Sequence, residues 1–120
     1  MRFRLVMTLI LILPLSAPAA EPCSIIHGRL HYYGGDGNLR LWHIGTHHEF
    51  EPDQSSWERG FDWLTAGTRK GDSERFASPE SNLDLYGDFT VCPVEPFKQG
   101  SVQHARILDV KKRVYVRLQD

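Results

Sequence analysis

Imidazole and carboxylate side chains gather in one short stretch of this sequence, residues 42–50 (WHIGTHHEF). The stretch contains four groups that can bind a metal ion: His43, His47, His48 and Glu49. Imidazole nitrogens and carboxylate oxygens suit zinc, copper or nickel. The spacing matches no established metal-binding motif such as HExxH, and histidines beside a strand are often solvated surface side chains. We therefore treat a metal site here as the alternative hypothesis and expect no resident cofactor.

Three further side chains are candidate binding residues because of the faces on which they are expected to lie. His27 and His31 alternate with apolar residues in residues 24–33 (SIIHGRLHYY), so they share the polar side of a predicted strand. If that strand forms a hairpin with the next one, pairing brings both histidines towards the histidine-rich stretch. Trp63 lies off the apolar face of a predicted helix and is the aromatic side chain of that helix best placed for exposure.

The chain has two cysteines, Cys23 and Cys92. In an oxidising compartment, an even pair in a small domain predicts a disulfide. A bridge between them closes a loop of about 70 residues and stabilises the folded state by about 4 kcal/mol, mainly by restricting the unfolded chain. A reactive thiol or a metal ligand is the alternative, but no CxxC spacing supports it.

Residues 1–20 have the three parts of a secretory signal peptide. Two arginines precede an apolar run over residues 5–15, and a segment of small residues ends at Ala19 and Ala20, after either of which we expect cleavage. The apolar run is too short for a membrane-spanning helix, which needs roughly 20 apolar residues. We therefore expect a periplasmic or secreted protein with no transmembrane segment after cleavage.

Residues 21–120 have the size of a single domain. They carry 12 basic and 15 acidic residues, a net charge of −3, which gives no general affinity for nucleic acids or anionic membranes. The sequence contains neither the GxSxG nor the Ser-x-x-Lys signature of hydrolytic enzymes. We therefore expect a non-catalytic protein.

Alternating polar and apolar residues predict about five strands in this domain. The predicted strands are residues 24–33, 38–46, 83–94, 100–110 and 113–118. A Gly-Gly-Asp-Gly sequence between the first two is typical of a hairpin turn. Between the second and third, Ser55 and Glu58 fit a capping box that begins one short helix, and a polar loop follows over residues 68–82. The pattern favours a mainly β fold, an antiparallel sandwich or a small open barrel with a helix-and-loop insertion.

Several segments resemble an uncharacterised family of small exported proteobacterial proteins. They are Gly28-Arg29-Leu30 after Cys23, Leu39-Arg40-Leu41-Trp42 with Ile44-Gly45-Thr46, and Gly87-Asp88-Phe89-Thr90-Val91-Cys92-Pro93. The resemblance implies a paired Cys23 and Cys92 and a Gram-negative envelope setting. It brings no assigned activity and no catalytic residues.

Our leading hypothesis is an exported β-domain that binds an unidentified protein or small ligand of the cell envelope through an exposed strand face and the insertion loop. The alternative is a metal-binding protein that uses His43, His47 and His48. A purely structural envelope component is a third class, and it predicts neither a pocket nor a convergent cluster of polar side chains.

Overall fold

The computed structural model describes Thr8 and residues 21–120. The predicted signal peptide, residues 1–20, lies outside this part of the chain except for Thr8. In chain order the elements are β1 Ser24–Tyr33, β2 Asn38–His43, β3 Glu49–Pro52, α1 Gln54–Thr65, α2 Asp72–Arg75, the 3-10 helix η1 Pro79–Asn82, β4 Leu83–Pro93 and β5 Gln103–Arg117. The fold is mainly β, as the sequence predicts.

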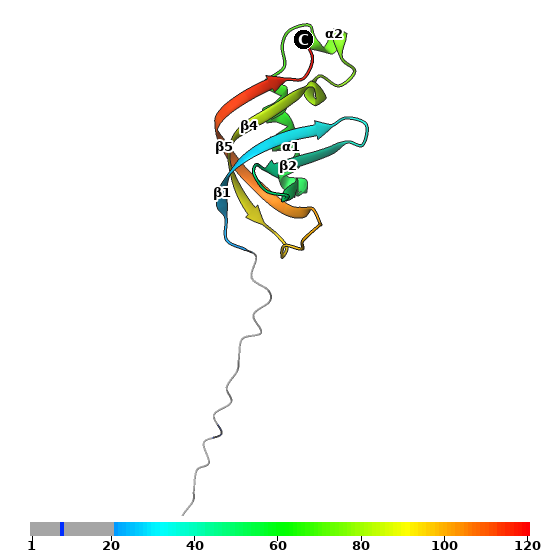
Figure 1. The fold of residues 1–120 in the computed structure, drawn as a ribbon. Helices are drawn as coiled ribbons and strands as arrows, with labels where there is room; N and C mark the ends of the chain where they lie inside the picture. The colour runs from blue at the N-terminus through cyan, green and yellow to red at the C-terminus, as the bar shows by residue number, and fades with distance from the viewer. Residues whose placement is uncertain (1–7, 9–20) are drawn as a thin grey trace, which may run out of the picture.

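The five strands form one closed barrel in the order β1-β2-β3-β5-β4. β1 is antiparallel to β2 on one edge and to β4 on the other, whereas β3 and β5 are parallel. Figure 1 shows the strands curving around the barrel. This strand order, with a helix between β3 and β4, is the topology of the OB fold, a five-stranded Greek-key barrel. The prediction of a mainly β fold, an antiparallel sandwich or a small open barrel with a helix insertion, is confirmed in its barrel form, with two differences: the barrel is closed, and β3 and β5 are parallel.

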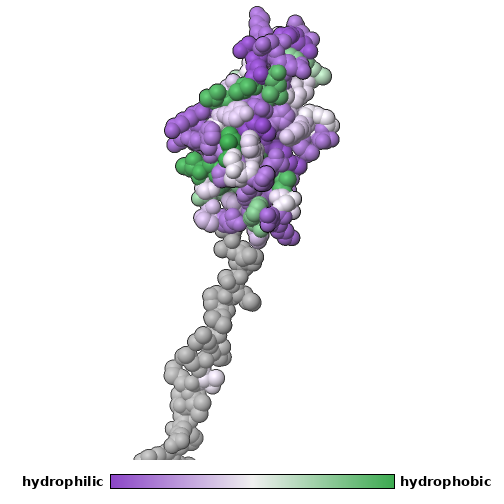
Figure 2. Space-filling model, in the orientation of Figure 1, coloured by the Kyte–Doolittle hydropathy of each residue, from purple (hydrophilic) through white to green (hydrophobic). Residues whose placement is uncertain are grey.

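Alternation along the strands builds the core inside the barrel. Ile26 and Leu30 of β1 point inward, and between them a Cβ on Gly28 would lie only 2.8 Å from the Leu41 side chain. The remaining buried apolar residues of the core are Leu39, Leu41, Phe50, Leu64, Leu83, Leu85, Phe89, Val91, Ala105, Ile107 and Val110. The outer side is different: Figure 2 shows mainly hydrophilic residues, with hydrophobic ones in separate small areas.

Helix α1 begins two residues before the position that the capping-box pattern predicts. Its N-cap is Asp53, whose carboxylate accepts a hydrogen bond from the Ser56 backbone N–H at 3.0 Å. Ser55, the predicted cap, lies in the first turn and donates its hydroxyl hydrogen to Asp53. The prediction was wrong because Asp is as good a cap as Ser, and Pro52 before it ends the preceding strand.

The structure also corrects two strand predictions. The four-residue β3 was not predicted, because so short a segment shows too little alternation to be recognised. The predicted turn at residues 109–112 lies within β5, so the two last predicted strands are one. Between the pairs Asp88–Lys111 and Tyr86–Val114, β5 has one residue more than β4, and the resulting bulge includes Lys112 with a φ of 56°.

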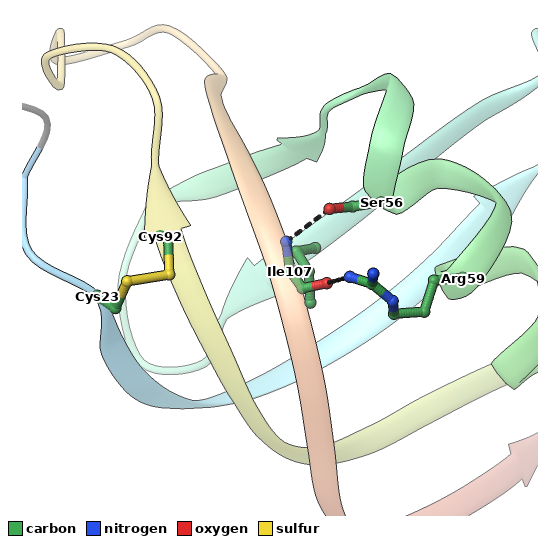
Figure 3. The surroundings of a disulfide bond; sticks show 5 residues. All are labelled: Cys23, Ser56, Arg59, Cys92 and Ile107. Atoms are coloured by element: carbon green, nitrogen blue, oxygen red, sulfur yellow. Dashed lines mark hydrogen bonds between the residues drawn. A yellow bond between two sulfur atoms is a disulfide. The ribbon is translucent and has the colours of Figure 1, made fainter.

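Helix α1 satisfies hydrogen-bonding groups of β5 beyond the short stretch that pairs with β3. The Ser56 hydroxyl accepts a hydrogen bond from the Ile107 N–H at 2.9 Å, and Arg59 donates to the Ile107 carbonyl at 2.7 Å (Figure 3). Just before them, the Asp53 N–H donates to the Ala105 carbonyl at 2.8 Å. An open strand edge is a template for unwanted pairing, and α1 covers this one.

The predicted disulfide between Cys23 and Cys92 is present and joins residues 69 positions apart. It links the chain just before β1 to the end of β4, as Figure 3 shows. Because β1 and β4 are also paired along eight residue positions, the bridge secures one end of that pairing.

The predicted polar loop over residues 68–82 contains α2 and η1 and is fastened to the barrel. Asp72 is buried and accepts two hydrogen bonds of 2.9 Å from Arg117 at the end of β5. These bonds, together with one from the Arg69 backbone, lower the pKa of Asp72 to about 2. Arg117 is therefore committed to this ion pair.

Candidate binding face

Outward-facing side chains of neighbouring strands line up in two parallel rows across the barrel. The paired row consists of Val116, Asp84, His31, Arg40, Glu51 and His104, in the strand order β5-β4-β1-β2-β3-β5. The central row is displaced from the paired row by two residues on each strand. It consists of Val114, Tyr86, Arg29, Trp42 and Glu49. Directly opposite residues on paired strands have side chains close enough to interact. The two rows use that proximity in different ways.

In the paired row, each charged or ionisable side chain has a partner of opposite sign. His31 Nδ1 lies 2.6 Å from Asp84 Oδ1, and both side chains are largely buried, with exposed fractions of 17% and 10%. Arg40 contacts Glu51 at 3.0 Å. Because the partners come from different strands, these contacts tie β4 to β1 and β2 to β3.

His104 at the end of the paired row lies between two carboxylates. Its Nδ1 is 2.8 Å from Glu95 and its Nε2 is 2.9 Å from Glu51. The hydrogen bond to Glu95, aided by the charges of both carboxylates, raises the pKa of His104 above its usual value. The His104 backbone N–H and ring in turn lower the pKa of Glu95. Since Glu95 lies in the loop between β4 and β5, this contact fastens that loop to the barrel.

The central row contains two opposite charges that do not meet. The Arg29 guanidinium lies over the Trp42 ring, 4.9 Å from its centroid, and the buried Nε of Arg29 has no hydrogen-bond partner among the described residues. Glu49 is on the other side of Trp42, opposite it on β3. Within the described chain, neither Arg29 nor Glu49 forms an ion pair within 4 Å.

Arg29, Trp42 and Glu49 line a shallow hollow of about 390 Å³, whose other lining residues are Thr46 and His47. The Trp42 indole N–H donates to the Thr46 carbonyl at 2.7 Å, which fixes the ring against the loop after β2. The hollow therefore has an aromatic side chain held in place, a cation on one side of it and a carboxylate on the other.

The side chains of the four residues of the predicted metal site do not converge, and each has different surroundings. His48 is stacked between Phe50 and Phe97, and its Nε2 donates to Gln103 at 2.8 Å. His47 is exposed at the rim of the hollow, Glu49 lines it, and His43 ends β2. In residues 21–120, no three His, Cys, Asp or Glu side chains are placed so that they could hold a metal ion.

The other three candidate binding residues lie in different places. His31 belongs to the paired row, and His27, on the same side of β1, is 3.3 Å from Asp88 of β4. Trp63 of α1 is partly buried, packs against the core and has Arg113 over its ring at 5.7 Å. Trp57 and Phe61 are partly buried in the same way, so Trp63 is not distinguished by exposure.

Sequence reasoning did not single out Arg29 and Trp42 as a site. Both residues lie on the polar sides of strands that were predicted at these positions, and both fall in the segments of the family resemblance. Their contact depends on the β1–β2 alignment, in which Arg29 is opposite Trp42. Counting back from the Gly-Gly-Asp-Gly turn could have revealed that alignment, because hairpin length fixes the pairing of its strands.

A larger hollow of about 700 Å³ lies at the other end of β1, lined mainly by small and polar residues of the α2–η1 segment and the C-terminus. Its only cationic side chain, Arg75, is bound to the Asp120 carbonyl. This hollow therefore offers no uncommitted charge.

No helix in the described part of the chain is long and apolar enough to cross a membrane. Comparison with known proteins brings no match to any family model, any curated protein or any solved structure.

Proposed function

We propose that this chain is an exported, non-catalytic binding domain of the periplasm or extracellular medium, and that its ligand binds at the central row on β1, β2 and β3. One observation carries this proposal. Arg29 is held over Trp42 in a surface hollow with a desolvated nitrogen that no described residue satisfies. A buried donor without a hydrogen-bond partner is destabilising and needs an explanation. Arg117 Nε is in the same state, but the Arg117 guanidinium is bound to Asp72, whereas the Arg29 guanidinium has no ion-pair partner among the described residues.

The surrounding surface supports the same proposal. Arg40 and His104 in the neighbouring row, and His27 on the same strand as Arg29, all have carboxylates within 4 Å. Among the charged residues of the two rows, only Arg29 and Glu49 lack such a partner within residues 21–120. The outer face around β2 and β3 is also where many OB-fold proteins bind their ligands, which is an analogy of architecture only.

An NMR experiment on the exported, ¹⁵N-labelled protein tests this proposal. We would add fractionated cell-envelope extract, separated into small molecules and polymers, and map the changes in amide and indole signals. We expect the changes to centre on residues 28–30, 41–43 and 49–50 and on the Trp42 indole N–H. R29M should abolish them, and R106Q, which removes an exposed arginine elsewhere, should not. Changes that centre on another surface, or that persist in R29M, would refute the proposed site.

A metal-binding function is less well supported, because His43, His47, His48 and Glu49 do not converge. Calorimetric titration with zinc and copper checks this directly. Binding tighter than about 100 µM that is lost in H47A would restore it as the better candidate.

A further inference from the structure

The two unpaired charges of the central row indicate what kind of molecule binds there. We infer that the hollow takes a small zwitterion, a molecule with a carboxylate at one end and an amine at the other, lying across Trp42. This inference rests on the proposed function, since it names the ligand class of the same site.

The carboxylate end is assigned to Arg29. A guanidinium presents donors in a planar fork that matches a carboxylate, and it can make these bonds while it is stacked on an aromatic ring. Arg29 lies over Trp42 and has no competing carboxylate among residues 21–120. A carboxylate ligand would therefore bind to donors that are already positioned.

The amine end is assigned to Glu49. This carboxylate also lines the hollow and has no ion-pair partner in the described residues. It makes the site unfavourable for a ligand that carries only negative charge, such as a phosphate dianion, because like charges repel in a partly desolvated site. A ligand that also carries a positively charged amine is attracted to Glu49 instead.

The arrangement of the strands sets the separation of the two groups in the ligand. Arg29 and Glu49 lie on β1 and β3, with β2 and Trp42 between them. Strand spacing puts their backbones about 10 Å apart. An α-amino acid has its two charges on one carbon, whereas an ω-amino acid or a short peptide separates them across an apolar or planar middle. The latter layout fits the aromatic ring between the two charges.

Four matched probes test the inference by calorimetry and NMR on the exported protein: 6-aminohexanoate, hexanoate, hexylamine and glycine. Triglycine serves as the peptide counterpart of the first. Each probe is titrated up to about 10 mM, where weak ligands are detected. We expect 6-aminohexanoate or triglycine to bind about 10-fold to 100-fold more tightly than the other three, because it makes two charge-assisted contacts. The stronger of these two distinguishes an amino-acid-like ligand from a peptide-like one.

Two variants assign the charges. R29M should remove the advantage of the zwitterions over hexylamine, and E49Q should remove their advantage over hexanoate. R106Q and E74Q make the same charge changes at exposed positions away from the hollow and should leave the affinities unchanged.

The outcomes separate this inference from the proposed function. If hexanoate binds as tightly as 6-aminohexanoate and E49Q has no effect, the zwitterion inference is wrong while the Arg29 site stands. If no probe binds but envelope extract perturbs the central row, the ligand class is wrong and the function stands. If neither probes nor extract perturb the central row, both are wrong.

Discussion

The paired row and the central row lie side by side on the same strands, yet the charged side chains of the first form ion pairs and those of the second do not. In the paired row, His31 is bound to Asp84 and Arg40 to Glu51, so the side chains contribute to holding the barrel together. In the central row, Arg29 and Glu49 are kept apart by Trp42, and neither forms an ion pair within the described residues. We propose that these two neighbouring rows have different roles, one in stability and one in contact with another molecule. Four experiments test this division.

The largest effect is expected from removal of the disulfide, which secures the pairing of β1 and β4, two strands that carry residues of both rows. C23A/C92A should lower the free energy of unfolding by about 4 kcal/mol, because the unfolded chain is no longer restricted. Denaturant unfolding of the variant and of the disulfide-bonded parent protein measures this. Hydrogen exchange should show loss of protection in β1 at both rows together. Loss confined to one row would mean that the rows are not supported by a common strand.

Breaking the paired row should cost less, but still a measurable amount. D84N removes the charged partner of His31 at a largely buried position, and we expect a loss of about 1–3 kcal/mol in unfolding free energy. D36N, in the exposed turn between β1 and β2, is the control and should change stability by less than about 0.5 kcal/mol. Equal stabilities of D84N and D36N would contradict a structural role for the paired row.

The central row should behave in the opposite way. R29M removes a partly desolvated cation without a partner and keeps the apolar stem, so stability should stay unchanged or rise by up to about 1 kcal/mol. R40M, the same substitution one row away, should lower stability by up to about 1 kcal/mol because Glu51 loses one of its two partners. If R29M is the more destabilised of the two, Arg29 has a structural role and the comparison between the rows fails.

The smallest effect concerns pH and the end of the paired row. Because contact with Glu95 raises the pKa of His104, this contact stabilises the loop fully below the ordinary pKa of histidine, about 6.5. It is lost as the pH rises through the raised value. NMR order parameters of residues 95–101 should therefore fall on going from acid to alkaline solution. In H104Q they should be low at both pH values, and a fall of equal size in H104Q would exclude His104 as the cause.

The sequence predicted the parts of the fold that depend on local pattern. The alternation in residues 24–33 matches β1, and the glycine-rich turn and the cysteine pair were also predicted correctly. Local pattern could not predict β3, because a four-residue strand is defined by its neighbours. It also divided β5 in two, because polar residues and lysines at the bulge look like a turn when the partner strand is unknown.

The candidate site was harder to predict, for a related reason. His27 and His31 were recognised as outward-facing, but Asp88 and Asp84, with which they pair, are 61 and 53 positions away in the sequence. Only the β1–β4 alignment shows that these histidines are committed and that Arg29 between them is not. The histidine-rich stretch attracted attention by its composition, whereas the site depends on which charged residue lacks a partner.

The contacts between α1 and Ile107 have a consequence for how the barrel folds. A slip of β5 by one residue would put Arg106 or Leu108 in the place of Ile107 and turn every inward side chain of that strand outward. Ser56 and Arg59 bind both backbone groups of Ile107, so these two hydrogen bonds favour the native alignment of β5. The alignment of the last strand therefore depends on α1 as well as on the strands with which β5 pairs.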